Sequence, residues 1–229
     1  MKVLRHLPNA LTSANLICGC LGIISVFNYP VAAAYFIWAA CFFDFLDGFA
    51  ARLLKVSSPI GKQLDSLADL VSFGVLPAMA MFQWIDANAE SGWMPYIAII
   101  IAVFSALRLA KFNIDENQSD SFIGVPTPAN ALFITSLVFL PETIRVVIFS
   151  APVLIIITVV FSFLMVSPIN LIALKFKNFK WSGNEVRFTF LALSVFLLVF
   201  LQAGAIPFII LSYIAISLVS GVFSAKKTN

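Results

Sequence analysis

The sequence predicts an all-α membrane protein, a polytopic bundle of about eight transmembrane helices. Of the 229 residues, 61% are apolar and only 11% are charged, whereas a soluble domain carries about 25% charged residues. The apolar residues come in long runs, and a membrane-spanning helix needs roughly 20 of them. These two observations predict that lipid surrounds most of the chain.

Eight hydrophobic segments give the expected helix count. They cover residues 10–28, 31–53, 63–84, 94–112, 128–141, 145–166, 187–203 and 205–224. Pro141 and Glu142 divide the stretch from 128 to 166 into one short and one normal span. The last two segments are separated by only a few residues, so a tight re-entrant hairpin remains an alternative there. We expect one domain over residues 1–229, with the segments at 187–224 as accessory helices.

Basic residues predict the topology. With eight spans, only Arg145 falls on one side of the membrane. The other thirteen fall on the opposite side: Lys2, Arg5, Arg52, Lys55, Lys62, Arg108, Lys111, Lys175, Lys177, Lys180, Arg187, Lys226 and Lys227. By the positive-inside rule, both termini are expected in the cytoplasm of a multi-pass inner (plasma) membrane protein. No basic run is long enough to suggest a nucleic-acid partner.

Four of the eleven acidic residues lie inside or at the ends of these segments. Asp44 and Asp47 are spaced i,i+3, and Asp65 and Asp69 are spaced i,i+4, so each pair shares one face of its helix. Both pairs fall in the cytosolic third of the predicted bundle. Ionisable groups at membrane depth cost several kcal/mol or more, so they indicate a functional site.

Four carboxylates in a medium of low dielectric constant need a strong counter-charge, and Arg52 alone is too little. One or two divalent cations would supply it, and oxygen-only ligands favour Mg²⁺ or Mn²⁺ over zinc. Two ions about 3.5–4 Å apart could clamp a pyrophosphate. Gly48, Ala51 and Gly61 would let such a ligand approach the backbone. For Gly48 and Ala51, close helix packing is the alternative.

The pattern Asp44-x-x-Asp47-Gly48-x-x-Ala51-Arg52, eight residues, then Gly61-x-x-x-Asp65-x-x-x-Asp69, resembles the complete signature of the CDP-alcohol phosphotransferase family. The resemblance implies an integral membrane enzyme with a core of six helices. Such enzymes transfer a phosphatidyl or similar group from a CDP-linked donor to an alcohol and release CMP. A homodimer is also implied.

The resemblance also implies roles for single residues. Asp44, Asp47 and Asp65 would ligate metal, with Mg²⁺ or Mn²⁺ as the cofactor and two ions expected. Asp69 would be the general base that takes the proton of the acceptor hydroxyl, and also a ligand of a second metal ion. The residues that would bind the CDP-linked donor are Asn9, Thr12, Gly48, Ala51, Arg52 and Gly61.

Four further stretches resemble the bacterial phosphatidylserine synthase branch of the family. They are Pro8-Asn9-x-x-Thr12-x-x-Asn15, Ser72-Phe73-Gly74-x-x-Pro77, Arg108-Leu109-Ala110-Lys111-Phe112-Asn113 and Gly124-Val125-Pro126-Thr127-Pro128-Ala129-Asn130. A Met165-Val166-Ser167 ending to the sixth segment is similar too. The implied reaction takes CDP-diacylglycerol and L-serine, in a membrane lipid environment, to phosphatidylserine and CMP.

Arg108, Lys111 and Asn113 are the predicted acceptor-binding residues, because a bidentate Arg108 could orient the carboxylate of serine. Lys111 could instead be a basic anchor at the membrane surface, and residues 124–128 could simply be a rigid loop. Three other functions stay open. The first is phosphatidylglycerophosphate synthesis or another reaction of the same family. The others are a divalent-cation transporter, whose site would lie nearer the membrane midplane, and a non-catalytic scaffold.

Overall fold

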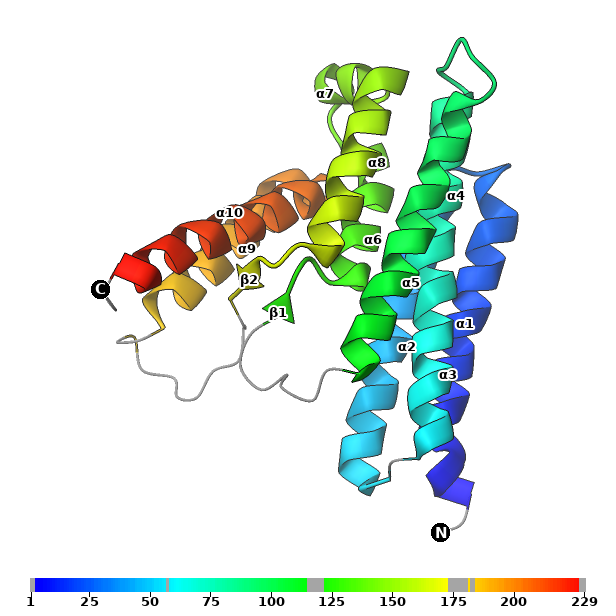
Figure 1. The fold of residues 1–229 in the computed structure, drawn as a ribbon, viewed down its shortest axis with the longest axis vertical. Helices are drawn as coiled ribbons and strands as arrows, with labels where there is room; N and C mark the ends of the chain where they lie inside the picture. Colours follow the sequence, from blue (N-terminus) through cyan, green and yellow to red (C-terminus); the bar gives the residue numbers. More distant parts are fainter. Residues whose placement is uncertain (1–2, 57, 115–121, 173–180, 182–183, 227–229) are drawn as a thin grey trace.

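The structure is a computed structural model that describes residues 3–56, 58–114, 122–172, 181 and 184–226. Helices dominate it (Figure 1), so the predicted all-α membrane fold is confirmed. Among the described residues the only strands are β1, Phe122–Ile123, and β2, Asn170–Leu171. Each has two residues, and they pair antiparallel, which ties two connecting segments together.

The first two long helices form an antiparallel pair at one edge of the bundle (Figure 1). A 3₁₀ turn, η1 (Val3–His6), leads into α1 (Leu7–Val26), and α2 (Ala32–Leu54) returns beside it. The two helices pack together along their length. Gly22 allows this approach, because a Cβ atom built there would lie 3.0 Å from the Cβ atom of Phe36.

The third helical stretch is continuous from residue 59 to 86 but changes its winding on the way. It consists of α3 (Pro59–Asp69), a π-helical segment η2 (Leu70–Val75) and α4 (Leu76–Asp86). Ser58 caps its start by accepting a hydrogen bond of 3.0 Å from the Gly61 N–H. In η2 the Leu76 N–H reaches back five residues to the Val71 carbonyl. Pro77 explains the wider turn, since it has no N–H and its ring crowds the preceding turn.

The next helix returns through the bundle and packs against η2. It begins with a 3₁₀ turn, η3 (Met94–Ala98), and continues as α5 (Ile99–Ile114). Gly74 of η2 meets Ser105 of α5 closely, because a Cβ atom built on Gly74 would lie 2.9 Å from the Cβ atom of Ser105. This contact fixes which face of α5 looks toward the bundle interior.

The prediction of one continuous segment over residues 145–166 is wrong. After α6 (Thr127–Ser136) and the 3₁₀ turn η4 (Leu137–Phe139), the chain forms a short α7 (Glu142–Ile148) and a separate α8 (Ala151–Val166). The stretch 127–139 and α7 meet at 119°. Pro141 and Pro152 explain the breaks before α7 and before α8, because a proline in a helix interior removes a backbone hydrogen bond.

The last two helices form a hairpin that is inclined to the other helices (Figure 1). α9 (Glu185–Leu201) and α10 (Ala205–Lys226) pack against each other across the turn η5 (Gln202–Gly204). Gln202 has a positive φ of 49°. Gly204 lies against the backbone of Phe139, with a built Cβ atom 2.6 Å from that carbonyl oxygen. The hairpin is thereby attached to η4, the turn that follows α6.

Five stretches of the described residues are long and apolar enough to cross a membrane. They are Leu7–Val26, Ala32–Leu54, Pro59–Asp86, Met94–Ile114 and Glu185–Val219, the last of which covers both helices of the hairpin. The bent stretch from α6 to α7 would make six. Every predicted segment contains a helix, but the count of eight spans is not reached by this measure. At 16 residues, α8 is about 24 Å long, shorter than the ~30 Å of a bilayer core.

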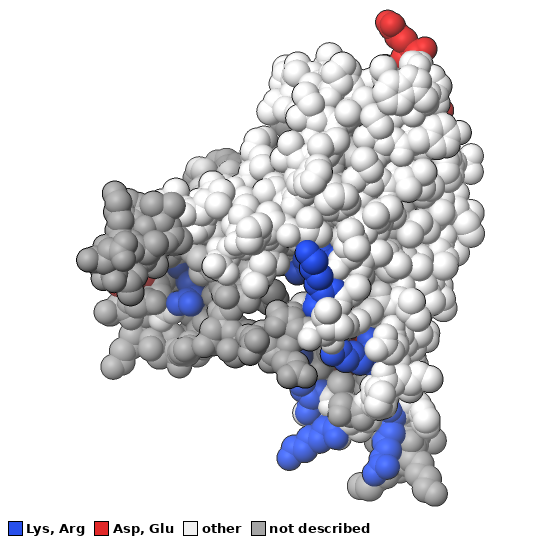
Figure 2. Space-filling view, in the orientation of Figure 1, with Lys and Arg blue, Asp and Glu red and all other residues white. Residues whose placement is uncertain are grey.

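Charged side chains are unevenly distributed over the molecule. Figure 2 shows Lys and Arg over the lower half of the visible face, toward the end where α2 finishes and α3 begins, and acidic side chains projecting at the opposite end. Of the basic residues used for the topology prediction, Lys2, Lys175, Lys177, Lys180 and Lys227 lie outside the described residues. The chain is a multi-pass membrane protein whose two ends differ in charge.

Candidate active site

Three carboxylates from two helices meet at one point. Asp44 and Asp47 lie on α2, and Asp65 lies on α3 after the short connection at residues 55–58. One carboxylate oxygen of each lies within 4.8 Å of the other two. The spacing along α2 puts its two carboxylates on one face, and the tight turn into α3 brings the third opposite them. The structure therefore brings the three predicted metal ligands together, while their binding of a metal ion stays a prediction.

Helix α1 contributes a row of polar side chains to the same place. The Thr12 hydroxyl lies 2.6 Å from a carboxylate oxygen of Asp47 and can donate to it. One turn further along, the Asn15 amide nitrogen donates to Asp69 at 3.0 Å. The Ser72 hydroxyl in turn donates to the Asn15 carbonyl at 2.9 Å. These bonds fix α1 between α2 and the third helical stretch.

A pocket of about 250 Å³ opens beside the carboxylates, between the first turns of α1, the last turns of α2 and the start of α3. It is lined by Arg5, Pro8, Asn9, Thr12, Asp47, Gly48, Ala51, Val56, Ser58, Gly61, Lys62 and Asp65. Five of the six residues predicted to bind the donor are among them, namely Asn9, Thr12, Gly48, Ala51 and Gly61. The sixth, Arg52, is exposed, and its guanidinium lies 3.4 Å from a Cβ atom built on Gly48.

Gly61 has little room for a side chain at the pocket wall. A Cβ atom on Gly61 would lie 3.1 Å from the Asn9 side-chain oxygen and 3.0 Å from the Ser58 hydroxyl, so it would crowd the pocket wall.

Two basic residues that were used only to predict the topology, Arg5 and Lys62, also line the pocket. The signal that could have found Arg5 is its position one helical turn before Asn9.

The donor set of the carboxylate cluster suits a divalent cation. Asp44, Asp47 and Asp65 offer oxygen ligands only, half-buried or buried, and close enough for one ion to contact all three. Hard cations with a preference for oxygen bind such sets. Asp69 is not part of this group of three, so its predicted role as a further metal ligand stays a prediction.

The arrangement agrees with a comparison against protein families. A family model described as CDP-alcohol phosphatidyltransferase matches residues 5–164, which is more than half of the chain. The chain belongs to the CDP-alcohol phosphatidyltransferase family. The matched residues contain α1 to α7 and most of α8 and exclude the α9–α10 hairpin.

Several members of this phosphatidyltransferase family resemble the chain strongly. The chain is 37% identical over 187 residues to the CDP-diacylglycerol–serine O-phosphatidyltransferase of Bacillus subtilis, a match that covers 80% of this chain and 96% of that protein. It is 38% identical over 136 residues to the Helicobacter pylori protein of the same name, covering 58% of this chain and 57% of that one. For the Methanocaldococcus jannaschii protein the identity is 39% over 123 residues, covering 54% and 55%.

Asp69 has surroundings of its own within this phosphatidyltransferase site. It is buried, with 9% of its surface exposed, and it interacts electrostatically with Asp44, Asp65 and Asp47. Its hydrogen bond from Asn15 orients the carboxylate. Asn15 is therefore a candidate site residue that the sequence analysis quoted in a motif but gave no role. The signal was present, since it continues the three-residue spacing of Asn9 and Thr12 along a membrane-embedded helix.

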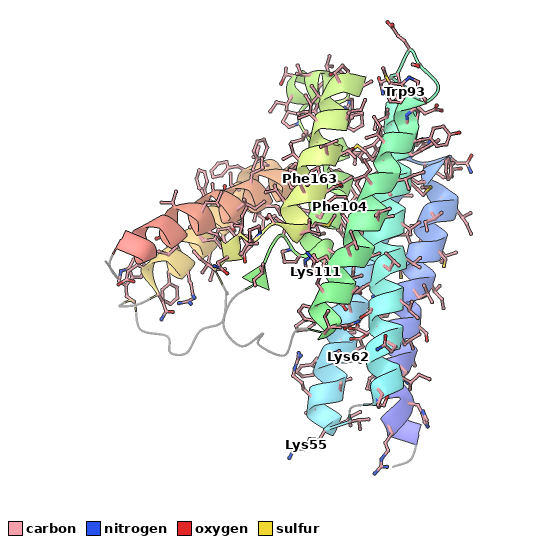
Figure 3. All side chains as sticks on the ribbon, viewed as in Figure 1. Lys55, Lys62, Trp93, Phe104, Lys111 and Phe163 are labelled. Carbon is pink, nitrogen blue, oxygen red and sulfur yellow. The ribbon has the colours of Figure 1, made fainter. Side chains whose placement is uncertain are left out.

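The predicted acceptor-binding residues lie on the last turns of α5 and differ in their contacts. Arg108 is half-buried and interacts electrostatically with Asp69. Its Nε has no hydrogen-bond partner among the described residues. Lys111 is exposed, on the side of α5 that faces β1 in Figure 3. The Asn113 amide donates to the Ser66 hydroxyl at 2.8 Å, which joins α5 to α3. Acceptor binding stays a prediction for all three.

Residues of the stretches that carry the resemblance to phosphatidylserine synthases lie in close contacts between helices. Gly124 has φ +71° and lies against the Met165 carbonyl, where a Cβ atom would clash. The Ser105 hydroxyl contacts the Met165 sulfur at 3.6 Å. A Cβ atom on Gly19 would meet the Ser72 hydroxyl at 2.5 Å. These small residues allow close packing. Part of the sequence pattern that resembles phosphatidylserine synthases therefore serves helix packing around the site.

Proposed function

We propose that the protein transfers the phosphatidyl group of CDP-diacylglycerol to the hydroxyl of L-serine, giving phosphatidylserine and CMP. The observation that carries the proposal is the match along 96% of the Bacillus subtilis protein named for this reaction. The site supports it independently, because the signature carboxylates and the pocket-lining residues meet at the start of α1, the end of α2 and the start of α3.

The residues have distinct tasks in this reaction. The donor's nucleotide and pyrophosphate occupy the pocket beside Gly48, Ala51 and Gly61. Asp69 accepts the proton of the serine hydroxyl as its oxygen forms a bond to the phosphatidyl phosphorus, and the bond from that phosphorus to CMP breaks. Asn15 holds the Asp69 carboxylate in one orientation, and Arg108 binds the serine carboxylate. Positioning of the two substrates supplies a large part of the rate.

Two divalent ions, Mg²⁺ or Mn²⁺, are the proposed cofactors. Asp44, Asp47 and Asp65 would hold one, and Asp69 would also contribute to the second. When bound, the ions would neutralise charge on the pyrophosphate and on the departing CMP. The Thr12 hydroxyl, in contact with Asp47, keeps that carboxylate in place.

We place the carboxylates and both termini on the cytoplasmic side of the inner membrane. The support is the uneven distribution of basic residues, thirteen against one in the predicted topology. This orientation lets a water-soluble amino acid reach a lipid-linked donor. The whole chain acts as one domain, with α9 and α10 accessory to it, and family resemblance favours a homodimer.

The test uses purified full-length protein in nanodiscs with CDP-diacylglycerol, Mn²⁺ or Mg²⁺, and labelled alcohols offered one at a time. Labelled serine is expected to enter lipid, with one CMP released for each lipid formed. Labelling by glycerol 3-phosphate alone would refute the serine assignment and favour phosphatidylglycerophosphate synthesis. Transport of Mn²⁺ into sealed vesicles without CMP release would refute the enzyme assignment and favour a transporter.

A further inference from the structure

The first turn of α6 carries buried polar side chains that have no hydrogen-bond partner. Thr127 and Asn130 lie one turn apart on this helix, and both are 0% exposed. Among the described residues, the Thr127 hydroxyl and both polar atoms of the Asn130 amide lack a partner. Buried polar groups in proteins are almost always hydrogen-bonded, because leaving one unpaired costs free energy. An unpaired buried donor or acceptor is therefore a candidate ligand-binding group, which further observations must support.

Contacts between neighbouring elements place this turn near Arg108. The chain enters α6 past the end of α8, where the Val125 N–H donates to the Leu164 carbonyl at 3.0 Å. The next residue of α8, Met165, contacts the Ser105 hydroxyl. Arg108 follows Ser105 by three residues and so shares its face of α5. The start of α6 and the Arg108 face of α5 thus meet at the same end of α8.

The same helix also packs against the segment that follows the proposed base. α6 packs against η2, whose first residue directly follows Asp69. In the part of the chain that the structure describes, two further groups that interact with Asp69 contain an atom without a partner: Nε of Arg108, and the side-chain oxygen of Asn15, whose amide nitrogen bonds to Asp69. Unpartnered donors and acceptors therefore lie on α1, α5 and α6, three helices that each pack against η2.

We propose that Thr127 and Asn130 are acceptor-binding residues that select an amino acid through its ammonium group. The proposal rests on the serine reaction proposed above. A zwitterion brings a carboxylate, which needs donors such as Arg108, and an ammonium group, which needs acceptors. The oxygens of Thr127 and Asn130 supply acceptors without adding charge. A phosphorylated acceptor would need further cations, which neither residue provides.

The primary test measures kcat and KM of Thr127→Val and Asn130→Leu for serine and for CDP-diacylglycerol. Each variant is expected to raise the KM for serine by about tenfold or more, as is typical when a hydrogen bond to a charged group is lost. The KM for CDP-diacylglycerol is expected to stay close to that of the wild type. Ser136→Ala is the matched control, because this buried hydroxyl also lacks a partner among the described residues but lies at the other end of the same helix.

Acceptor analogues identify the group that each residue holds. 3-Hydroxypropanoate lacks the ammonium group of serine, and ethanolamine lacks its carboxylate. Asn130→Leu is expected to shrink the preference for serine over 3-hydroxypropanoate, measured as a ratio of kcat/KM, and to leave the preference over ethanolamine nearly unchanged. Arg108→Leu is expected to do the reverse. Asn130→Ser provides the same comparison if the leucine variant does not fold.

Two results would overturn the inference without touching the proposed function. One is a wild-type KM for serine in folded Thr127→Val and Asn130 variants. The other is an equal loss of serine and 3-hydroxypropanoate use, which indicates a structural role only. If the wild-type protein uses glycerol 3-phosphate and ignores serine, the proposed function itself is wrong. Binding of serine, followed by its effect on thermal unfolding, separates affinity from turnover.

Discussion

Replacing Asn15 by leucine is expected to lower kcat while leaving the KM for both substrates little changed. Asn15 lies on α1, is not among the residues that line the donor pocket, and donates one hydrogen bond to Asp69. If Asp69 is the base, this bond sets the direction of the carboxylate at the moment when the proton is transferred. The substitution tests the base and its orientation together, with no direct change to a proposed metal ligand.

The size of the effect follows from the geometry. The Asn15 nitrogen and the Asp69 oxygen are 3.0 Å apart, and both side chains are buried. A hydrogen bond to a charged group contributes about 1.5–3 kcal/mol. Since about 1.4 kcal/mol corresponds to a factor of ten in rate, the expected loss in kcat is about tenfold to about 150-fold. Leucine has a similar size, so we expect the variant to fold, with a lower thermal stability because the buried hydrogen bond to Asp69 is lost.

The assay is CMP release in a double-mutant cycle with Asp69→Asn. Loss of a general base lowers the rate by about 10²–10⁴, so Asp69→Asn alone is expected to be slow but measurable. In that background Asn15→Leu should have almost no further effect, because its partner has already been neutralised. Equal fold losses in the two backgrounds would refute the reasoning and show that Asn15 acts independently of Asp69. Near wild-type activity of Asp69→Asn would refute the base itself.

Three further predictions concern the metal, the donor pocket and the fold. Chelation should abolish activity and Mn²⁺ should restore it, while Asp65→Asn should raise the Mn²⁺ concentration needed for half-maximal rate; an unchanged Mn²⁺ titration would contradict the cluster. Gly48→Leu should raise the KM for CDP-diacylglycerol and spare that for serine, because its side chain would enter the pocket; equal changes in both KM values would argue against a donor site. Gly124→Ala should lower the free energy of unfolding by about 1–3 kcal/mol, measured in detergent, because φ is +71° and Met165 leaves no space. Gly92→Ala is its control, with no atom within 4 Å of the added carbon, and an equal loss of stability there would refute the strain argument.

The carboxylate cluster could be predicted from the sequence because its geometry is local. The spacing of Asp44 and Asp47 sets one face of α2, and only a short turn separates that helix from Asp65. Helical periodicity and a tight connection then leave few ways to arrange the three side chains. The same reasoning placed Gly48 and Gly61 beside them, and both line the pocket.

Contacts between distant helices could not be predicted in this way. Asn15 and Asp69 are separated by 54 positions, and which face of α1 meets the third helical stretch depends on packing along both. Gly19 and Gly22 allow that approach, but glycine in an apolar run indicates close packing without naming the partner. That the Asn130 amide is buried without a partner could not be predicted for the same reason, since burial on all sides is a property of the whole bundle.

The division at Pro141 was predicted, but the break between α7 and α8 was missed, because hydropathy does not register it. Residues 145–166 are almost continuously apolar, and an apolar run predicts one span. The chain nevertheless turns between α7 and α8, with Pro152 placed in the first turn of the new helix, where its missing N–H costs nothing. Proline positions were the better signal there than average hydrophobicity.

The π-helical segment after Asp69 shows how one residue connects the site to the bundle. Pro77 removes a backbone donor, and the turn before it widens, with the Leu76 N–H bonded five residues back. Within that widened turn Ser72 contacts α1 through Asn15, while Gly74, two residues on, contacts Ser105 of α5. Residues two positions apart on a helix point to opposite sides, so η2 contacts both helices at once. Asp69, the proposed base that precedes this segment, is thereby positioned between α1 and α5 and interacts with Asn15 on the first and Arg108 on the second. One of these helices carries the residue proposed to orient the base, and the other carries the residue proposed to bind the acceptor.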